Sequence, residues 1–509
     1  MKIEIAIVGG GGDTAAPVDA FRGHENVVAF ACEGEAPYLG GAHAGDQALL
    51  ERVRALGDFT GKRGAATLVY GAGEPARWAL AGLGPRDELG PRAWRAAGAA
   101  ARKVLVGESV RRAALVLPPG ADAGELVAAL ALSGYKYDRY ISEESKRARR
   151  LEDVTLLAPD GDGAAALADA VARARADAAA VLLARDLEGA PASEVTPPRL
   201  AEEAERIAAA SDGRIACRVL DEDALAAENF GALLAVGRGS AEPSRLIVLE
   251  YTPQTQAPPG RTLCLVGKGV TFDSGGLTLK PGNKMPEMKA DMGGAAAVLG
   301  VFQALAGRDL PLRVVGLVPA VENMPAGNAY RPGDILVTRR GLSVEVISTD
   351  AEGRLILADA LDYAGSFAPD LIVDLATLTG SCTIALGGEA AGMMANAAGA
   401  AWQVALQACG EHVGERLWPL PLFDEYAEKL ESDVADMKNS GGRLGGASIA
   451  GKFLERFVGE RPWVHLDIAG AVHTLKERDL TPAVPNGFGV RLLLAFLPVF
   501  AGERPAPGA

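Results

Sequence analysis

Cysteine is scarce in this sequence of 509 residues, and what there is forms no recognisable pattern. The five cysteines are scattered, odd in number and without a Cys-x-x-Cys pair. A disulfide framework and a thiolate zinc site both need paired or closely spaced cysteines, so neither is indicated. This cysteine usage favours a reducing compartment, and we expect the protein to be cytoplasmic.

Membrane and secretion signals are also missing. The longest apolar runs, such as residues 490–500, are well short of the roughly 20 residues that cross a bilayer. The N-terminal stretch carries Glu4 inside a short apolar segment, which predicts a first β-strand rather than a signal peptide. We therefore expect no membrane association.

Basic charge is low, which bears on nucleic-acid binding. The chain has 51 Lys and Arg against 65 Asp and Glu, for a formal net charge of -14. Binding to a phosphate backbone needs a concentrated basic surface, and the best local candidate is the KRARR run at residues 146–150. Charge runs of this kind are usually solvated faces, so the composition argues against nucleic acid as a partner.

Common hydrolase motifs are absent as well. The sequence has no HExxH and no GxSxG motif, and its five histidines show no metal-ligand spacing. His465 lies within a strand pattern, where a packed side chain is expected. Histidine-based zinc peptidases and serine hydrolases are therefore poorly supported.

The composition that remains is that of a globular protein. Hydrophobic residues make up 49% and charged residues 23% of the chain. A single core stops growing at roughly 250 to 300 residues, so we expect two domains. Residues 1–160 alternate helical patterns with short strand patterns, as in an α/β domain, and the strands are predicted at residues 3–8, 27–32, 66–70, 113–117 and 154–157. The Ala-rich segment 161–190 predicts a linker helix, and residues 191–509 form the second, larger domain.

The larger domain has stronger strand patterns. Several are continuous apolar runs, which are expected when helices cover both faces of a mostly parallel sheet. We predict an α/β fold with an N-terminal α/β domain and a larger C-terminal α/β domain that has a mixed, mostly parallel sheet flanked by helices. The strands of the larger domain are predicted at residues 246–249, 262–266, 313–318, 344–347, 371–375 and 463–468.

Polar residues gather where these strands end. Lys268 and Asp273 follow the strand at 262–266, and Asp350 and Glu352 follow the strand at 344–347. Asp291 precedes a Gly pair and a helical run. In open α/β sheets, ligands bind at the carboxyl edge of the strands. Clustered carboxylates repel one another, and divalent metal ions would resolve that repulsion.

Taken one at a time, these residues also have structural interpretations. Asp291 is well placed to be the N-cap of the helix that follows it, and Thr349 or Asp350 could cap the helix that begins near Arg354. The gathering of several such residues at strand ends is what favours chemistry over capping.

Three long strings give the sequence a specific resemblance. VGKGVTFDSGG (266–276), MKADMGGAA (288–296) and TDAEGRL (349–355) closely resemble the leucyl aminopeptidases of the cytosolic type, and SDVADMKN (432–439), GGRLGGASIAGKF (441–453) and WVHLDIAG (463–470) extend the match. The resemblance covers residues 185–500. It implies a catalytic C-terminal domain, a macro-like N-terminal domain, peptide substrates and a homohexamer.

The resemblance also implies two divalent metal ions, Mn²⁺ or Zn²⁺. One would be held by Lys268, Asp273, Asp291 and Glu352, and the other by Asp273, Asp350 and Glu352. A lysine ligand must be neutral, although its unperturbed pKa is about 10.4. Burial beside two dications would favour the neutral amine.

The remaining roles follow from the same resemblance. A water bridging the metals would attack as hydroxide, and Arg354 would hold a bicarbonate that acts as general base, because Arg itself stays protonated. Lys280 would stabilise the oxyanion. The pocket for the first side chain, suited to Leu or Met, is expected to be lined by Met288, Thr377, Leu378 and Gly380.

Two points qualify this interpretation. Ser348 stands where the family usually has Asn, which replaces an amide near the site with a shorter hydroxyl. The alternative function is a non-catalytic family member acting as a binding or DNA-associated scaffold. Loss of a metal ligand would mark such a member, and all five ligand positions are present here.

Overall fold

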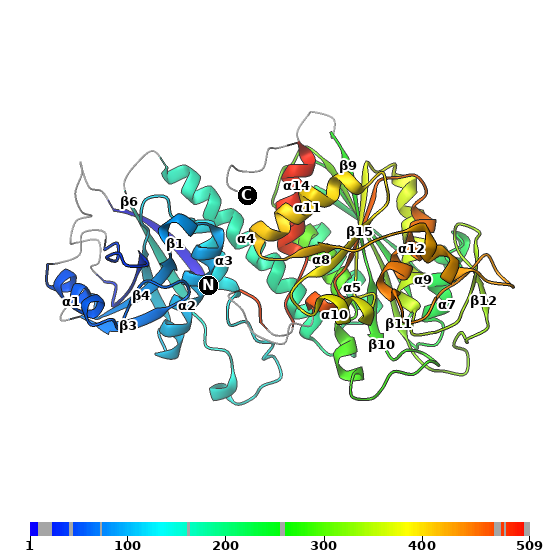
Figure 1. Cartoon of the computed structure of the whole chain (residues 1–509), viewed down its shortest axis with the longest axis horizontal. Helices are drawn as coiled ribbons and strands as arrows, with labels where there is room; N and C mark the ends of the chain where they lie inside the picture. The colour runs from blue at the N-terminus through cyan, green and yellow to red at the C-terminus, as the bar shows by residue number, and fades with distance from the viewer. Residues whose placement is uncertain are drawn as a thin grey trace. The chain divides into compact units, whose positions relative to one another are not determined.

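A computed structural model describes residues 1–8, 23–39, 44–71, 74–159, 163–254, 260–472, 480–482 and 485–502 (Figure 1). The fold is mixed α/β, as predicted. Two compact units divide within helix α4 (Ala164–Gly189): Met1–Ala178 makes up the bulk of the first, and most residues from Ala179 onward make up the second. The domain bounds expected at residues 160 and 190 stay a prediction.

The first unit contains, among its described residues, a 6-stranded sheet of order β1-β6-β5-β2-β4-β3. Neighbouring strands pair in parallel except for β3 and β4. β4 was not predicted, because its Ala- and Gly-rich sequence has a weak strand pattern. The elements are β1 (Lys2–Val8), β2 (Asn26–Cys32), α1 (Ala44–Ala55), β3 (Ala66–Tyr70), β4 (Arg77–Gly84), α2 (Pro91–Gly107), β5 (Arg112–Val116), α3 (Ala123–Leu132) and β6 (Asp153–Pro159).

The second unit is built on a larger sheet. Its order is β16-β15-β18-β14-β9-β11-β8-β7, with β10 added on β11. The central strands β18, β14, β9 and β11 are parallel, and β14 is buried along its whole length. The strands are β7 (Ile215–Leu220), β8 (Arg245–Tyr251), β9 (Thr262–Gly267), β10 (Gly269–Asp273), β11 (Arg313–Asn323), β14 (Leu371–Ala376), β15 (Ala391–Ala395), β16 (Leu417–Pro419) and β18 (Trp463–Asp467).

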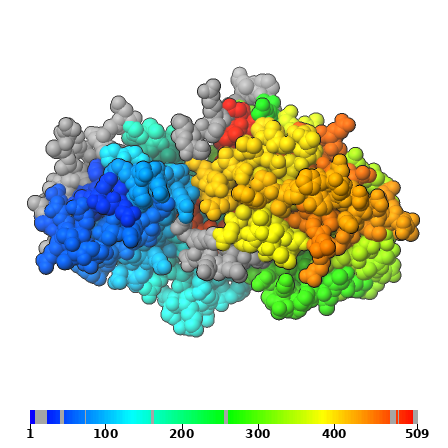
Figure 2. Space-filling model, viewed as in Figure 1, coloured from blue at the N-terminus to red at the C-terminus, as the bar shows by residue number. Residues whose placement is uncertain are grey.

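Helices cover both faces of this sheet, which explains its long apolar strands. The helices α5, α8, α11 and α14 pack on one side, and α7, α9 and α12 pack on the other (Figure 1). The segments from α10 to α12, yellow to orange, form much of this unit's surface in the face shown by Figure 2. The helices are α5 (Pro197–Ala209), α6 (Glu222–Ala227), α7 (Gly231–Gly237), α8 (Gly293–Leu305), α9 (Glu352–Ala364), α10 (Gly380–Leu386), α11 (Ala400–Val413), α12 (Gly446–Val458), α13 (Ala469–Val472) and α14 (Val490–Ala501).

One predicted strand belongs elsewhere. Residues 344–347 were expected to join the main sheet, but β13 (Ser343–Glu345) lies in a separate 3-stranded sheet of order β12-β13-β17, with β12 (Ile335–Val337) and β17 (Met437–Lys438). The expectation that Asp350 and Glu352 follow a strand of the main sheet is therefore wrong. Asp350 and Glu352 reach the site from the loop between β13 and α9.

The structure also bears on membrane association and on the basic run considered for nucleic-acid binding. Within the described ranges, no helix is both long and apolar enough to span a bilayer. In the basic run 146–150, Lys146 lies 2.5 Å from Glu143 and Arg150 lies 3.1 Å from Asp138. These two basic side chains are therefore engaged in local ion pairs.

Candidate metal centre

Lys268 lies at the carboxyl end of β9, the strand that enters the middle of the sheet. Its backbone N–H donates to the carbonyl of Leu375 at 3.0 Å, which fixes the lysine against β14. The side chain is almost fully buried, and Nζ donates to the carbonyl of Thr377 at 3.0 Å. Nζ also lies 2.8 Å from Oδ2 of Asp291 and 2.8 Å from Oε1 of Glu352. The lysine thus joins two carboxylates that are distant in sequence.

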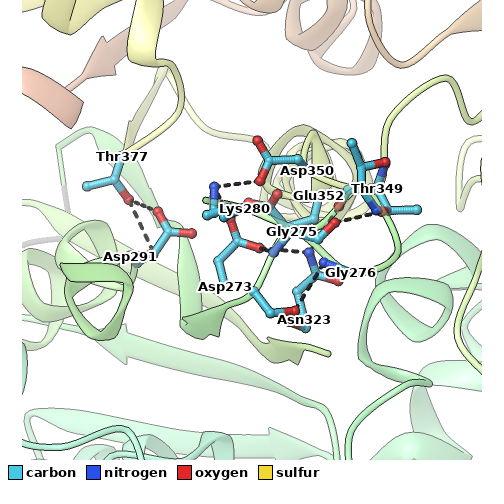
Figure 3. A network of polar contacts seen from close by, with 12 residues as sticks. Asp273, Gly275, Gly276, Lys280, Asp291, Asn323, Thr349, Asp350, Glu352 and Thr377 are labelled. Atoms are coloured by element: carbon cyan, nitrogen blue, oxygen red, sulfur yellow. Dashed lines mark hydrogen bonds and ion pairs between the residues drawn. The ribbon is translucent and has the colours of Figure 1, made fainter. Parts of the chain in front are cut away.

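Asp273 is the last residue of β10, the strand that begins directly after Lys268. Its Oδ1 accepts the N–H of Gly275 at 2.8 Å and the side-chain amide of Asn323 at 2.7 Å. Its Oδ2 lies 2.7 Å from Nζ of Lys280, whose ammonium also lies 2.6 Å from Oδ1 of Asp350 (Figure 3). Lys280 therefore sits between two carboxylates that come from different loops.

The turn after Asp273 depends on glycine. Gly275 and Gly276 have φ values of 85° and 60°, in the left-handed region that favours glycine. A Cβ at Gly275 would lie 2.8 Å from Oδ1 of Asp350, so the absence of a side chain lets the two loops approach.

Asp291 is not the N-cap of the helix that follows it. The N-cap position of α8 is Met292, which makes no side-chain capping bond. The Asp291 carboxylate instead pairs with Lys268, and its Oδ1 accepts from the hydroxyl of Thr377 at 2.7 Å. The capping interpretation of Asp291 is therefore wrong.

The caps considered for Thr349 and Asp350 are likewise not observed, since the N-cap of α9 is Ala351 without a side-chain bond. Thr349 is fully buried, and its hydroxyl donates to the carbonyl of Gly275 at 2.6 Å. Glu352 begins α9 and is 2% exposed, whereas the Asp350 side chain is 39% exposed. The loop therefore presents one buried and one accessible carboxylate.

Burial and charge act against each other in this cluster. Burial raises the pKa of Asp291 to about 6, despite the nearby ammonium of Lys268. Burial and the charges of Glu352 and Asp291 raise the pKa of Asp273 well above its ordinary value. Burial alone would lower the pKa of Lys268, but the charges of Asp291, Glu352 and Asp273 outweigh it and raise the pKa.

The cluster carries more negative than positive charge, because four carboxylates face the two ammonium groups of Lys268 and Lys280. Oxygens of Asp273, Asp350 and Glu352 lie within 4.8 Å of one another, a spacing that could hold a metal ion. Oε2 of Glu352 is buried and has no hydrogen-bond partner among the described residues. A divalent cation would satisfy that oxygen and offset the excess charge.

Arg354 is buried two residues further along α9. Its Nη1 donates to the carbonyl of Asn439 at 2.7 Å, and burial lowers the pKa of its guanidinium to about 10, so it stays charged at neutral pH. The side chain of Asn439 in turn holds the loop before α9: its Oδ1 accepts from the N–H of Ile347 at 2.8 Å, and its Nδ2 donates to the carbonyl of Ser348 at 2.7 Å.

Ser348 contributes through its hydroxyl, which accepts the N–H of Asp350 at 3.2 Å. The shorter side chain at this position therefore helps to hold the loop that carries Asp350.

The structure brings six of the predicted site residues together in one ion-pair cluster: Lys268, Asp273, Asp291, Asp350, Glu352 and Lys280. Arg354 is close to Glu352 in sequence.

The four residues expected to line the pocket lie on two segments. Met288 is half-buried in the 3-10 helix η4 (Met285–Ala290), just before Asp291. Thr377 is buried and bonded to Asp291, and Leu378 follows it. Gly380 begins α10, and a Cβ placed there would meet no atom within 4 Å. The structure therefore brings Thr377 directly to the cluster and leaves open space at Gly380.

Three residues that the sequence analysis did not assign contribute to this geometry. Asn323 bonds Asp273, Asn439 holds the loop before α9, and Asp467 accepts the hydroxyl of Thr379 at 2.6 Å and the N–H of Leu378 at 3.3 Å. Asn323 and Asp467 are the last residues of β11 and β18. A polar residue at the end of an apolar strand was the sequence signal by which Asn323 and Asp467 could have been identified.

Known proteins are similar to this chain over most of its length. The family model "Cytosol aminopeptidase family, catalytic domain" matches residues 182–494, and the model of that family's N-terminal domain matches residues 33–144. A "Probable cytosol aminopeptidase" of Syntrophotalea carbinolica is 47% identical over 449 residues, which is 86% of this chain and 89% of the relative. One of Geobacter sp. is 44% identical over 454 residues, 88% of this chain and 91% of the relative.

A solved structure is similar over nearly the whole chain. The bottromycin maturation enzyme BotP in complex with Mn has a TM-score of 0.82 at 35% sequence identity, covering 94% of this chain and 100% of that chain. The match therefore covers residues of both compact units.

Proposed function

Because the chain belongs to the cytosol aminopeptidase family, we propose that it removes the N-terminal residue of peptides at a two-metal centre, with a preference for leucine and other apolar residues. The observation that carries the proposal is the ion-pair cluster around Lys268 and Lys280, in which four carboxylates face only two ammonium groups. Folding stability does not require such a charge excess, and a metal centre does.

The ligand sets we propose are those implied by the family resemblance, and the contacts of the cluster support them. Lys268, Asp273, Asp291 and Glu352 would hold one ion, and Asp273, Asp350 and Glu352 would hold the other. The unpartnered buried Oε2 of Glu352 supports a bridging role for this residue. Carboxylate oxygens suit hard cations such as Mn²⁺, although Zn²⁺ also accepts them. The Mn in the BotP structure supports Mn²⁺ for this chain.

When bound, the ions supply a water of lowered pKa and a Lewis acid for the scissile carbonyl. Lys280 is placed to assist, because burial acts against its charge but the surrounding carboxylates raise its pKa and keep it protonated. Its ammonium is therefore a hydrogen-bond donor for the negative charge that develops on the carbonyl oxygen.

Arg354 cannot accept a proton from the attacking water, since its guanidinium has no acceptor atom. We propose that it holds a small anion, bicarbonate, as the proton acceptor. Its burial beside Glu352 at the start of α9 supports this assignment, because a buried guanidinium is stabilised by a bound anion.

Specificity for the N-terminal residue follows from the chemistry of the ligand. A free, neutral α-amine can coordinate a metal ion, whereas an internal amide nitrogen is a poor ligand. We place the first side chain against Met288, Thr377, Leu378 and Gly380. The hydroxyl of Thr377 is already engaged by Asp291, so the wall it offers is apolar.

We further propose that the protein is a cytoplasmic homohexamer. The names of the curated relatives support the location. Exposed apolar side chains such as Ile384, Phe423 and Leu444, at 82%, 63% and 92% exposure, offer surface that association would cover. The scaffold alternative is disfavoured, because all five ligand positions are present and clustered. A mass measurement in solution tests the assembly.

The activity is tested with leucine p-nitroanilide. Purified protein should release p-nitroaniline, lose activity to a chelator and regain it with Mn²⁺ or Zn²⁺. N-acetyl-leucine p-nitroanilide, which lacks the free amine, should not be cleaved. Turnover that survives exhaustive metal removal would overturn the two-metal proposal.

A further inference from the structure

Asn323 connects two loops that carry proposed metal ligands. It is the last residue of β11, is fully buried and faces Asp273 in the strand register. Its main-chain carbonyl accepts the N–H of Ser274 at 3.0 Å and the hydroxyl of Ser274 at 2.7 Å. The backbone of Asn323 therefore fixes the start of the turn that follows Asp273.

The side chain of Asn323 makes the connection. Nδ2 donates to Oδ1 of Asp273 at 2.7 Å and to the carbonyl of Thr349 at 3.0 Å (Figure 3). The same carbonyl accepts the hydroxyl of Tyr330 at 2.7 Å. One amide group thus ties Asp273 to the residue that immediately precedes Asp350.

These contacts determine how the Asp273 carboxylate is turned. Oδ1 receives two N–H donors, from Gly275 at 2.8 Å and from Asn323 at 2.7 Å. Oδ2 is left to face the cluster, where it lies 2.7 Å from Nζ of Lys280. Without the Asn323 donor, rotation of the carboxylate about its Cβ–Cγ bond would be opposed only by the Gly275 N–H and the Lys280 ammonium among these contacts.

The amide oxygen of Asn323 argues against a purely structural role. It is buried and has no hydrogen-bond partner among the described residues. A Cβ at Gly276 would lie 3.0 Å from this oxygen and 2.9 Å from the Thr349 hydroxyl, so glycine is what allows the close approach. A buried acceptor without a hydrogen bond lowers stability. The benefit of an asparagine at this position must therefore come from its two Nδ2 hydrogen bonds.

We propose that Asn323 is a positioning residue of the proposed metal centre: it turns Oδ2 of Asp273 towards the cluster, where the ions would be held, and keeps the turn after Asp273 aligned with the loop that carries Asp350 and Glu352. The inference rests on the proposed function, because it assumes that Asp273 is a ligand of both ions. Mutation of a residue that orients a metal ligand typically lowers metal affinity by roughly 10- to 100-fold.

The test is a calorimetric titration of Mn²⁺ into the metal-stripped full-length protein. Asn323→Ala should weaken Mn²⁺ binding by about 10- to 100-fold, and at both sites, because Asp273 serves both. Asn323→Leu, which fills the space without a donor, should do the same and replaces the Ala variant if that one does not fold. Tyr330→Phe, which removes only a bond to Thr349, should cause a smaller loss.

Asn396→Ala is the matched control. Asn396 is also buried and hydrogen-bonded: its Nδ2 donates to the carbonyl of Arg461 at 2.8 Å, and its Oδ1 accepts the N–H of Gly399 at 2.9 Å. It lies near the start of β18, however, whereas the site lies beyond the ends of the parallel strands. It should lower the melting temperature and leave Mn²⁺ affinity unchanged.

Two results would overturn the inference: wild-type Mn²⁺ affinity in the Asn323 variants, or an equal loss of affinity in Asn396→Ala, which would indicate general destabilisation. Failure of the wild-type protein itself to bind Mn²⁺ is distinguishable from both. It would overturn the proposed function, and the inference with it.

Discussion

Nζ of Lys268 lies 2.8 Å from Oε1 of Glu352, inside a buried cluster. In this arrangement the amine is protonated, and its positive charge balances part of the carboxylate charge. To bind a metal ion, the amine must lose that proton and use its lone pair, and the carboxylates around it are the other proposed ligands. Protons and metal ions therefore compete for one set of atoms, and the predictions below follow from that competition.

Replacing Lys268 by Met keeps the length of the side chain and removes the amine. We expect Lys268→Met to bind one Mn²⁺ per chain in place of two, because only one of the proposed sites uses the lysine. Turnover should fall by at least about 100-fold. Metal content after dialysis measures the effect, and two retained ions would show that the amine is not a ligand.

Metal binding should release protons and strengthen as the pH rises. The pKa of Asp291 is raised to about 6 and that of Lys268 is raised above its ordinary value, so both are more protonated in the folded protein than as free side chains. A bound ion must displace these protons. Calorimetry in two buffers of different ionisation enthalpy counts them. Lys268→Met should release fewer, and a release of zero in the wild-type protein would contradict the account.

Lys280 should matter for turnover more than for metal content. Lys280→Met removes the donor proposed for the developing oxyanion, and kcat should fall by about 10²- to 10³-fold. Mn²⁺ should be retained, since loss of the ammonium leaves Asp273 and Asp350 more negative. The exposed Lys284, four residues further on, gives the control variant Lys284→Met, with kcat expected to stay unchanged. Similar kcat values in the two variants would refute the role of Lys280.

The fold was largely predictable from strand and helix patterns. Five strands of the first unit and most central strands of the second were placed within a few residues, because continuous apolar runs mark strands buried on both faces. β10 was missed, since it begins with Gly269 and follows β9 after one residue. β13 was placed in the wrong sheet, because strand pairing depends on contacts distant in sequence, which a local pattern does not contain.

The site was only partly predictable from the residues alone. Asp291 before Gly293 has the same local pattern as a helix N-cap, and only its contact with Lys268 distinguishes the two. The resemblance to a family supplied the assignment. Asn323 was missed because its position opposite Asp273 arises from the pairing of β10 with β11, which was not predicted.

A stability prediction concerns Asp359, a fully buried residue of α9. Its carboxylate accepts the N–H groups of Ala232, Leu233 and Arg339 at 3.0, 2.9 and 2.7 Å, and burial nevertheless raises its pKa to about 7. Between about pH 4 and pH 7 the unfolded chain loses this proton and the folded protein keeps it, so this group makes stability fall as the pH rises.

Asp359→Asn cannot ionise and should remove that contribution. Urea unfolding at about pH 5 and about pH 8 should show a smaller loss of stability with pH in the variant than in the wild-type protein. The variant should also be less stable at the lower pH, because the amide group has one acceptor oxygen where the carboxyl group has two. Equal pH dependence in the two proteins would show that Asp359 does not keep its proton on folding.

The central claim is that five side chains form one centre for two metal ions. Anomalous diffraction from a crystal soaked in Mn²⁺ tests it most directly. We predict two anomalous peaks per chain, one among Lys268, Asp273, Asp291 and Glu352 and the other among Asp273, Asp350 and Glu352. A single peak, or peaks away from these side chains, would contradict the account.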